Sequence, residues 1–157
     1  MTHRIDTQTP IRQKGRRRKR VKPDGPGQRG PRRIDKAHKG RIAALPCIIC
    51  GARPVEVAHV RYACPASGKR ETGMAEKPSD KWTLPMCPLH HRIAPAAQHK
   101  MNEREFWDLH CIDPIEICEW LYRVSCAGGT EQIPIMLSIV NGARAKAEGA
   151  KKARQAV

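Results

Sequence analysis

The sequence is poor in aromatic residues and has no long apolar run. Three Trp, two Tyr and one Phe are present among 157 residues, which excludes a large core built on aromatic side chains. The longest apolar stretch, "IPIMLSIV" at 133–140, is interrupted by Pro134 and is shorter than the roughly 18 residues of a membrane span. The first ten residues, "MTHRIDTQTP", lack the apolar segment of a secretory signal. We therefore expect a cytoplasmic protein that does not associate with membranes.

Acidic residues are also scarce, with 15 Asp and Glu against 30 Lys and Arg. The imbalance is confined to the two ends: 15 basic against 3 acidic residues at 1–41, and 5 against 1 at 142–157. Basic tails bind polyanions because each neutralised phosphate releases counterions, so we expect DNA as partner, single- or double-stranded; RNA or anionic lipid satisfies the same charge argument. We predict a disordered basic arm at 1–41, a domain at 42–128, and a C-terminal helix with a basic tail at 129–157.

Local patterns between the tails predict an α+β domain. "VEVAHVRY" at 55–62 alternates as a strand does, and a second short strand is expected at 82–86. The polar stretch at 63–80 contains Gly and Pro and is expected to be a long loop. Asn102 and Asp113, the latter followed by Pro, are N-cap signals that predict two further helices, over "EREFWDLH" and up to the Gly pair at 128–129.

Seven cysteines without a secretory signal favour reduced thiols and metal ligation over disulfides. Cys47 and Cys50 form one closely spaced pair, and Cys87 and His90 form a second, with 36 residues between the pairs. Four such donors close a tetrahedron around Zn²⁺ and leave no vacancy for water, so we predict a structural zinc site. The remaining cysteines are expected to be small apolar residues: Cys64, Cys111, Cys118 and Cys126.

Two further histidines lie close to these pairs in the predicted elements. Pro88 is well placed at the first turn of a helix. On that helix His91 follows His90 and is turned from it by about 100°. His59 lies on the strand at 55–62. We therefore expect the zinc site to hold the helix with His91 directed toward His59.

Four segments within 45–108 resemble HNH, or ββα-metal, nucleases: "CIIC", "EVAHVR", "GMAEKPSDKWTLPMCPLHH" and "QHKMNEREFW". They are most similar to phage-associated proteins near the Ref-type recombination nucleases. The resemblance implies a small ββα-metal core with a structural zinc knuckle and extra C-terminal helices. It also implies a metal-dependent DNA endonuclease in a bacterial or phage-infected cell, with a recombinase filament as a further partner.

The resemblance also implies roles for single residues. His59 would be the general base that activates the attacking water, a role that suits an imidazole because it is largely neutral at pH 7. Arg61 would neutralise a neighbouring phosphate. Asp80 is open to two interpretations, as a metal ligand or as the residue that orients His59.

A catalytic Mg²⁺ or Mn²⁺ ion would be held by helix histidines, with His91 as the first choice and His99 as the second. On an unbroken helix a separation of eight positions corresponds to about 12 Å, which is too far for the two side chains to bind one ion. Joint ligation therefore requires a bend, and Pro95 can supply one.

Two alternatives remain open. In the first, the chain is a non-catalytic zinc module of degenerate HNH fold that binds DNA or RNA. It is favoured by Ala58, where many HNH proteins have an Asp or His ligand, and by the lack of an Asn near 80–82. In the second, the chain is a basic scaffold or ribosome-associated protein that uses zinc for stability.

Overall fold

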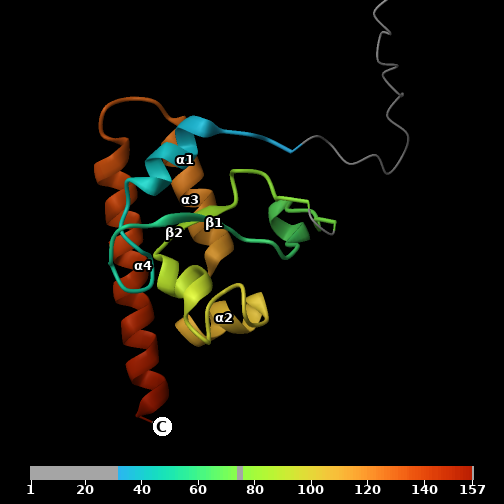
Figure 1. Cartoon of the computed structure of the whole chain (residues 1–157). Coiled ribbons are helices and arrows are strands. Elements are labelled where there is room, and N and C mark those ends of the chain that lie inside the picture. Colours follow the sequence, from blue (N-terminus) through green and yellow to red (C-terminus); the bar gives the residue numbers. More distant parts are fainter. Residues whose placement is uncertain (1–31, 74–75, 157) are drawn as a thin grey trace, which may run out of the picture. The chain divides into compact units, whose positions relative to one another are not determined.

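The computed structural model describes residues 32–73 and 76–156. The fold is α+β, as predicted: one two-stranded antiparallel sheet is surrounded by helices (Figure 1). The elements are α1 (Lys36–Ala43), β1 (Glu56–His59), the short helix η1 (Pro65–Ser67), β2 (Thr83–Met86), the short helix η2 (Leu89–Ile93), α2 (Glu103–His110), α3 (Pro114–Cys126) and α4 (Gln132–Gln155). In the part of the chain described, no helix has the length and apolar character to cross a bilayer.

The sheet pairs β1 with β2, and His59 lies opposite Thr83. All four residues of β2 are buried. β1 has two different faces, because Ala58 is 1% exposed and packs in the core while His59 is only half-buried. On the far side of β2, the amide of Ile48 donates to the carbonyl of Pro85 at 2.9 Å. The segment that carries the first cysteine pair is thereby fastened to the sheet.

The prediction of a disordered arm through residue 41 is wrong for residues 36–41, which belong to α1. Asp35 caps this helix, because its side chain accepts from the His38 amide at 2.9 Å. His38 and Ile42 are fully buried and hold α1 against the rest of the domain. Lys39 also pairs with Asp80 and Arg41 donates to Ser125, so burial and polar contacts together order this charged segment. Residues 32–35 of the predicted arm are described and lead into α1, and residues 1–31 lie outside the described residues.

Helices α2 and α3 begin at the predicted caps. The Asn102 side chain accepts from the amides of Arg104 and Glu105, and that of Asp113 accepts from Ile115 and Glu116. Both helices place their apolar sides in the core, which also takes residues from α1, the sheet and α4. The largest fully buried apolar side chains are Trp107, Phe106, Ile42, Leu45, Ile48, Leu84, Met86, Leu121 and Met136.

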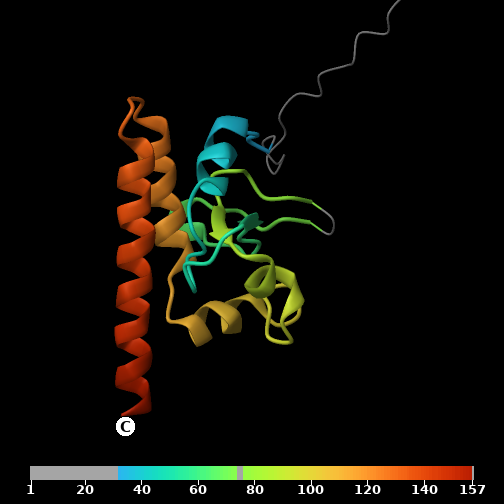
Figure 2. The ribbon, with the colours of Figure 1, turned by 60° about the vertical axis from the view of Figure 1, so that its left-hand side comes forward.

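Helix α4 packs along α3 and continues beyond it to the end of α2 (Figure 2). Near its C-terminus, Lys151 Nζ lies 3.1 Å from His110 Nδ1, and Arg154 donates to the carbonyl of Asp108 at 2.9 Å. The helix expected within 129–157 is therefore present. The basic residues expected in a tail lie in this helix, and two of them, Lys151 and Arg154, contact α2.

We predict that Asp113→Ala lowers the free energy of unfolding by about 1 kcal/mol, because two amides of the first turn of α3 lose their acceptor. Urea unfolding followed by circular dichroism measures the change. Asp108→Ala is the matched control, since Asp108 is exposed near the end of α2 and should change stability by less than about 0.5 kcal/mol. Equal effects of the two substitutions would contradict the role of Asp113 as a cap.

Candidate metal centre and histidine cavity

The first cysteine pair lies on a tight turn that is closed by Gly51. The Gly51 amide donates to the carbonyl of Cys47 at 2.8 Å, with φ at 74° in the left-handed region. A Cβ at this position would lie 2.9 Å from the guanidinium of Arg144 on α4. That guanidinium also donates to the Cys47 carbonyl at 3.4 Å. The positive φ of the turn therefore favours glycine here, whereas the Arg144 guanidinium is the end of a flexible side chain and could move aside.

Four side chains converge on one point, and we call them the metal cluster: Cys47, Cys50, Cys87 and His90. Their ligand atoms all lie within 4.8 Å of one another. The Cys50 and Cys87 sulfurs are 3.7 Å apart, and His90 Nδ1 is 3.2 Å from the sulfur of Cys87 and 3.9 Å from that of Cys47. Zn–S bonds of about 2.3 Å in a tetrahedron place sulfurs about 3.8 Å apart. The donor set therefore fits a closed Zn²⁺ site, as the sequence predicts.

The surroundings of Cys47 favour a thiolate. Burial alone raises the pKa of this thiol, but hydrogen bonds from the amides of Cys87, Cys50 and Ile49 outweigh burial and lower it. Because the thiolate is the form that binds metal, these amides prepare Cys47 as a ligand.

The other four cysteines do not join the metal cluster. Cys118 is fully buried, and Cys64 and Cys111 are partly buried, in keeping with small apolar residues. Cys126 is exposed at the end of α3, so its assignment as a packed apolar residue is wrong.

His59, on β1, is paired with a buried carboxylate. Its Nε2 lies 3.1 Å from Asp80 Oδ1, and the Asp80 side chain is 0% exposed. Asp80 also accepts from the Asp35 amide at 2.9 Å and pairs with Arg32 and Lys39. Burial opposes ionisation of Asp80, but these hydrogen bonds hold its pKa well below the ordinary value. Of the two interpretations of Asp80, the contact with His59 matches the orienting one.

The surroundings of His59 favour its neutral form. Burial lowers its pKa most strongly, Asp80 opposes this effect, and the cations Arg32 and Lys39 lower the pKa further. The neutral ring donates Nε2–H to Asp80, so its lone pair lies on Nδ1. The sequence does not predict the contacts from Arg32, Asp35 and Lys39, because these residues lie in the segment expected to be a disordered arm. Asp35 is the local signal for the start of α1, because its side chain can cap the helix.

His91 and His99 come together because η2 ends early. Ala94, directly before Pro95, has extended backbone angles of −58° and 153°, which stop the helix. The chain then reverses, and the His99 amide donates to the His91 carbonyl at 3.2 Å. The two ring centroids are 4.4 Å apart. The bend that joint ligation requires is therefore present at the predicted proline.

His91 also contacts Glu56, a residue that the sequence did not indicate. Its Nδ1 lies 2.7 Å from Glu56 Oε2, and Arg92 donates to the same carboxylate at 2.8 Å. Hydrogen bonds from Arg92 and then His91 lower the pKa of Glu56 to about 2. Strand alternation placed Glu56 on the face opposite His59, and the two partners are 35 residues apart, so no local pattern could have found the pair.

The predicted catalytic residues line one cavity of about 260 Å³, which we call the histidine cavity. Its walls include His59 at the end of β1 and Arg61 just after it. They also include His91 on η2 and His99 on the chain that follows η2. Within residues 32–73 and 76–156, the metal cluster alone gathers three or more Cys, His, Asp or Glu ligand atoms. The histidine cavity thus offers two neighbouring imidazoles.

We predict that Cys50→Ser removes bound zinc and unfolds the domain, because zinc contributes apparent free energies of about 10–16 kcal/mol in small sites. Elemental analysis of the purified chain and its melting temperature measure the two effects. Cys126→Ser is the matched control and should keep one zinc per chain, since Cys126 is exposed and outside the metal cluster. A zinc-loaded, folded Cys50→Ser protein would remove Cys50 from the ligand set.

Comparison with known proteins gives no further guide to function. No protein-family model, curated protein or solved structure matches the chain. The contacts of the metal cluster and of the histidine cavity, together with the sequence motifs, are therefore the observations that bear on function.

Proposed function

We propose that the chain is a metal-dependent endonuclease that hydrolyses phosphodiester bonds of DNA on a ββα-metal core. The observation that carries the proposal is the grouping of His59, Arg61, His91 and His99 around one cavity. The HNH-like motifs indicate the same residues from sequence. The metal cluster supports the proposal because His90 belongs to it and is the chain neighbour of His91.

His59 would act as the general base. Its Nδ1 lone pair takes a proton from a water molecule, whose oxygen forms a bond to phosphorus while the bond from phosphorus to the 3′ oxygen breaks. The departing 3′ oxygen takes a proton from solvent water and His59 returns its proton to solvent, so the products are a 5′-phosphate and a 3′-hydroxyl. Asp80 stabilises the imidazolium that forms, because its ionised carboxylate already contacts Nε2. Arg61, which lines the same cavity, would neutralise charge on the phosphate.

His91 and His99 would hold the divalent ion. Glu56 occupies Nδ1 of His91 and so directs its Nε2 to a metal, an arrangement typical of metal-bound histidines. Two imidazoles suit Mn²⁺ better than Mg²⁺, which prefers oxygen ligands. When bound, such an ion stabilises negative charge on the phosphate and on the departing oxygen.

A second candidate is a non-catalytic, zinc-stabilised nucleic-acid-binding module. It is favoured because the histidine cavity gathers fewer than three convergent ligand atoms in the described residues. Titration of zinc-loaded protein with Mn²⁺, followed by electron paramagnetic resonance, separates the two. One bound Mn²⁺ per chain that is lost in His91→Ala supports the nuclease, and no bound Mn²⁺ supports the binding module.

We predict that His59→Ala lowers the rate of plasmid nicking in Mn²⁺ by at least about 100-fold, because the water loses its proton acceptor. Zinc content and melting temperature should stay close to those of the unchanged protein, since His59 is outside the metal cluster. His3→Ala serves as the control for a histidine substitution. Undiminished nicking by the His59 variant would remove this residue as the base.

We predict that deletion of residues 1–30 weakens DNA binding and flattens its dependence on salt, because the segment holds 10 Lys and Arg against 2 Asp. The deletion stops before Arg32 so that the contacts to Asp80 remain. Melting temperature should not change. A chain whose first 30 residues are shuffled should bind DNA as tightly as the original, and a loss on shuffling would contradict a purely electrostatic arm.

A further inference from the structure

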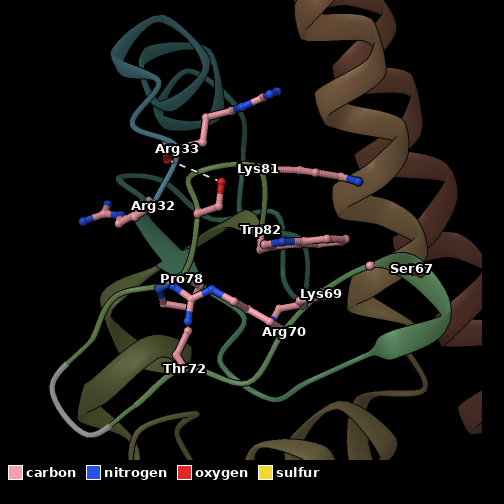
Figure 3. Close-up of a pocket in the computed structure, with 11 residues that line it drawn as sticks. Arg32, Arg33, Ser67, Lys69, Arg70, Thr72, Pro78, Lys81 and Trp82 are labelled. Atoms are coloured by element: carbon pink, nitrogen blue, oxygen red, sulfur yellow. Dashed lines mark hydrogen bonds between the residues drawn. The ribbon is translucent and has the colours of Figure 1, made fainter. Parts of the chain in front are cut away.

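A second cavity, of about 380 Å³, is lined by several cations and, among the residues that the structure describes, by no carboxylate (Figure 3). We call it the cationic cavity. One wall is the loop at 67–72 and the other is the segment at 78–82, with two arginines from the chain before α1. The volume falls in the range of about 300–1,000 Å³ that organic ligands occupy. Its five cationic residues are Arg32, Arg33, Lys69, Arg70 and Lys81.

Lys69 is the most unusual of these cations, because it is 1% exposed. Its Nζ donates to the carbonyl of Tyr62 and lies 5.9 Å from the Trp82 ring centre. Burial lowers the pKa of this ammonium. A positive charge held out of water is stabilised by a nearby anion. Glu103 already opposes the effect of burial from outside the cavity lining, and an anionic ligand in the cavity would stabilise the Lys69 ammonium further.

The carboxylates that pair with these cations lie outside the cavity lining. Arg32 pairs with Asp80, Arg70 with Glu76, and Lys81 with Glu119 at 3.0 Å. Lys81 also lies 4.3 Å from the Trp82 ring centre, which holds its ammonium beside the cavity. The charges of Asp35 and Glu103 act on Arg33 and Lys69 from outside the lining as well, and hydroxyl groups from the cavity walls add further hydrogen-bond donors.

The cationic cavity and the histidine cavity share a wall. Pro78 lines both of them. Arg70 lines the cationic cavity, and its partner Glu76 lines the histidine cavity. A ligand that fills the cationic cavity therefore lies beside the residues around His59.

We propose that the cationic cavity binds a phosphate group of the nucleic-acid strand, next to the phosphodiester that is cut at His59. Phosphate binding by the cavity does not depend on the proposed function, whereas its position next to the cut bond rests on that function. Guanidinium and ammonium groups together favour phosphate. The volume favours a phosphate with its flanking nucleotide over a free ion, and the shared wall places it on the same strand. The cavity then fixes which bond of the strand reaches His59.

The test introduces a negative charge without removing any of the cations. Ser67→Glu places a carboxylate at the wall of the cationic cavity, and Ser67→Gln has the same size without the charge. Ser138→Glu makes the same charge change on an exposed position of α4. Binding of a labelled single-stranded oligonucleotide to the full zinc-loaded chain is measured by fluorescence anisotropy across a salt series, without Mg²⁺ or Mn²⁺.

We expect Ser67→Glu to weaken binding about 10-fold and to reduce the slope of log affinity against log salt by about 0.7, the value for one lost phosphate contact. Ser67→Gln and Ser138→Glu should remain within about twofold of the unchanged protein. Equal losses in Ser67→Glu and Ser138→Glu overturn the proposal. An affinity for inorganic phosphate equal to that for the oligonucleotide also overturns the proposal.

Zinc content and melting temperature report whether Ser67→Glu is folded. If it is not, Lys81→Gln replaces it, with Arg123→Gln as control, because Arg123 is an exposed cation of α3 that lies outside the cavity and outside the two basic ends. A loss of about threefold confined to Lys81→Gln supports the cavity, and equal losses overturn it. The two proposals fail separately. Selective loss of binding in a chain that never cuts DNA overturns the nuclease and supports the phosphate site. Cutting by wild type with no selective loss of binding overturns the phosphate site alone.

Discussion

The convergence of three thiols and one imidazole is the constraint on which the rest of the domain depends. Cys47 and Cys50 precede β1, and Cys87 and His90 follow β2, so the metal cluster joins the two chain segments at the open end of the antiparallel pair. A two-stranded sheet alone is marginally stable, and the core contains few aromatic side chains. A bound zinc contributes about 10–16 kcal/mol, which is comparable to the whole stability of a small domain, about 5–15 kcal/mol.

The same constraint positions the histidine cavity. With His90 in the metal cluster, η2 is fixed against the sheet and the neighbouring His91 lines the cavity with His59. Each of these two imidazoles is then oriented by a carboxylate, His59 by Asp80 and His91 by Glu56. Asp80 contacts Nε2 of His59 and leaves Nδ1 of that ring free. Glu56 contacts Nδ1 of His91 and leaves Nε2 of that ring free. The two rings therefore differ in which nitrogen is left without a carboxylate partner.

The basic residues of the chain have several structural roles rather than one. Arg32 and Lys39 neutralise the buried Asp80, which in turn holds His59. Lys151 and Arg154 fasten α4 to α2. Other cations line a cavity beside the histidines. Net charge alone cannot separate these roles, because the partner of each cation is far away in the sequence.

The sequence by itself determined the features that depend on neighbouring residues. Asn102 and Asp113 begin α2 and α3 because a cap acts on amides two or three residues away. The two ligand pairs of the metal cluster were found for the same reason, since each pair sits on one turn. The stop of η2 before Pro95 also follows from local backbone sterics.

Only the tertiary structure decided which distant side chains meet. Helix α1 was missed because its charged sequence has no clear apolar periodicity, and it is ordered by burial of His38 and Ile42 against other elements. The pairs of Asp80 with Arg32 and of His91 with Glu56 join residues 48 and 35 positions apart. Such contacts depend on where the folded core places each element, and a buried charge there is stable only beside a partner that the chain path brings to it.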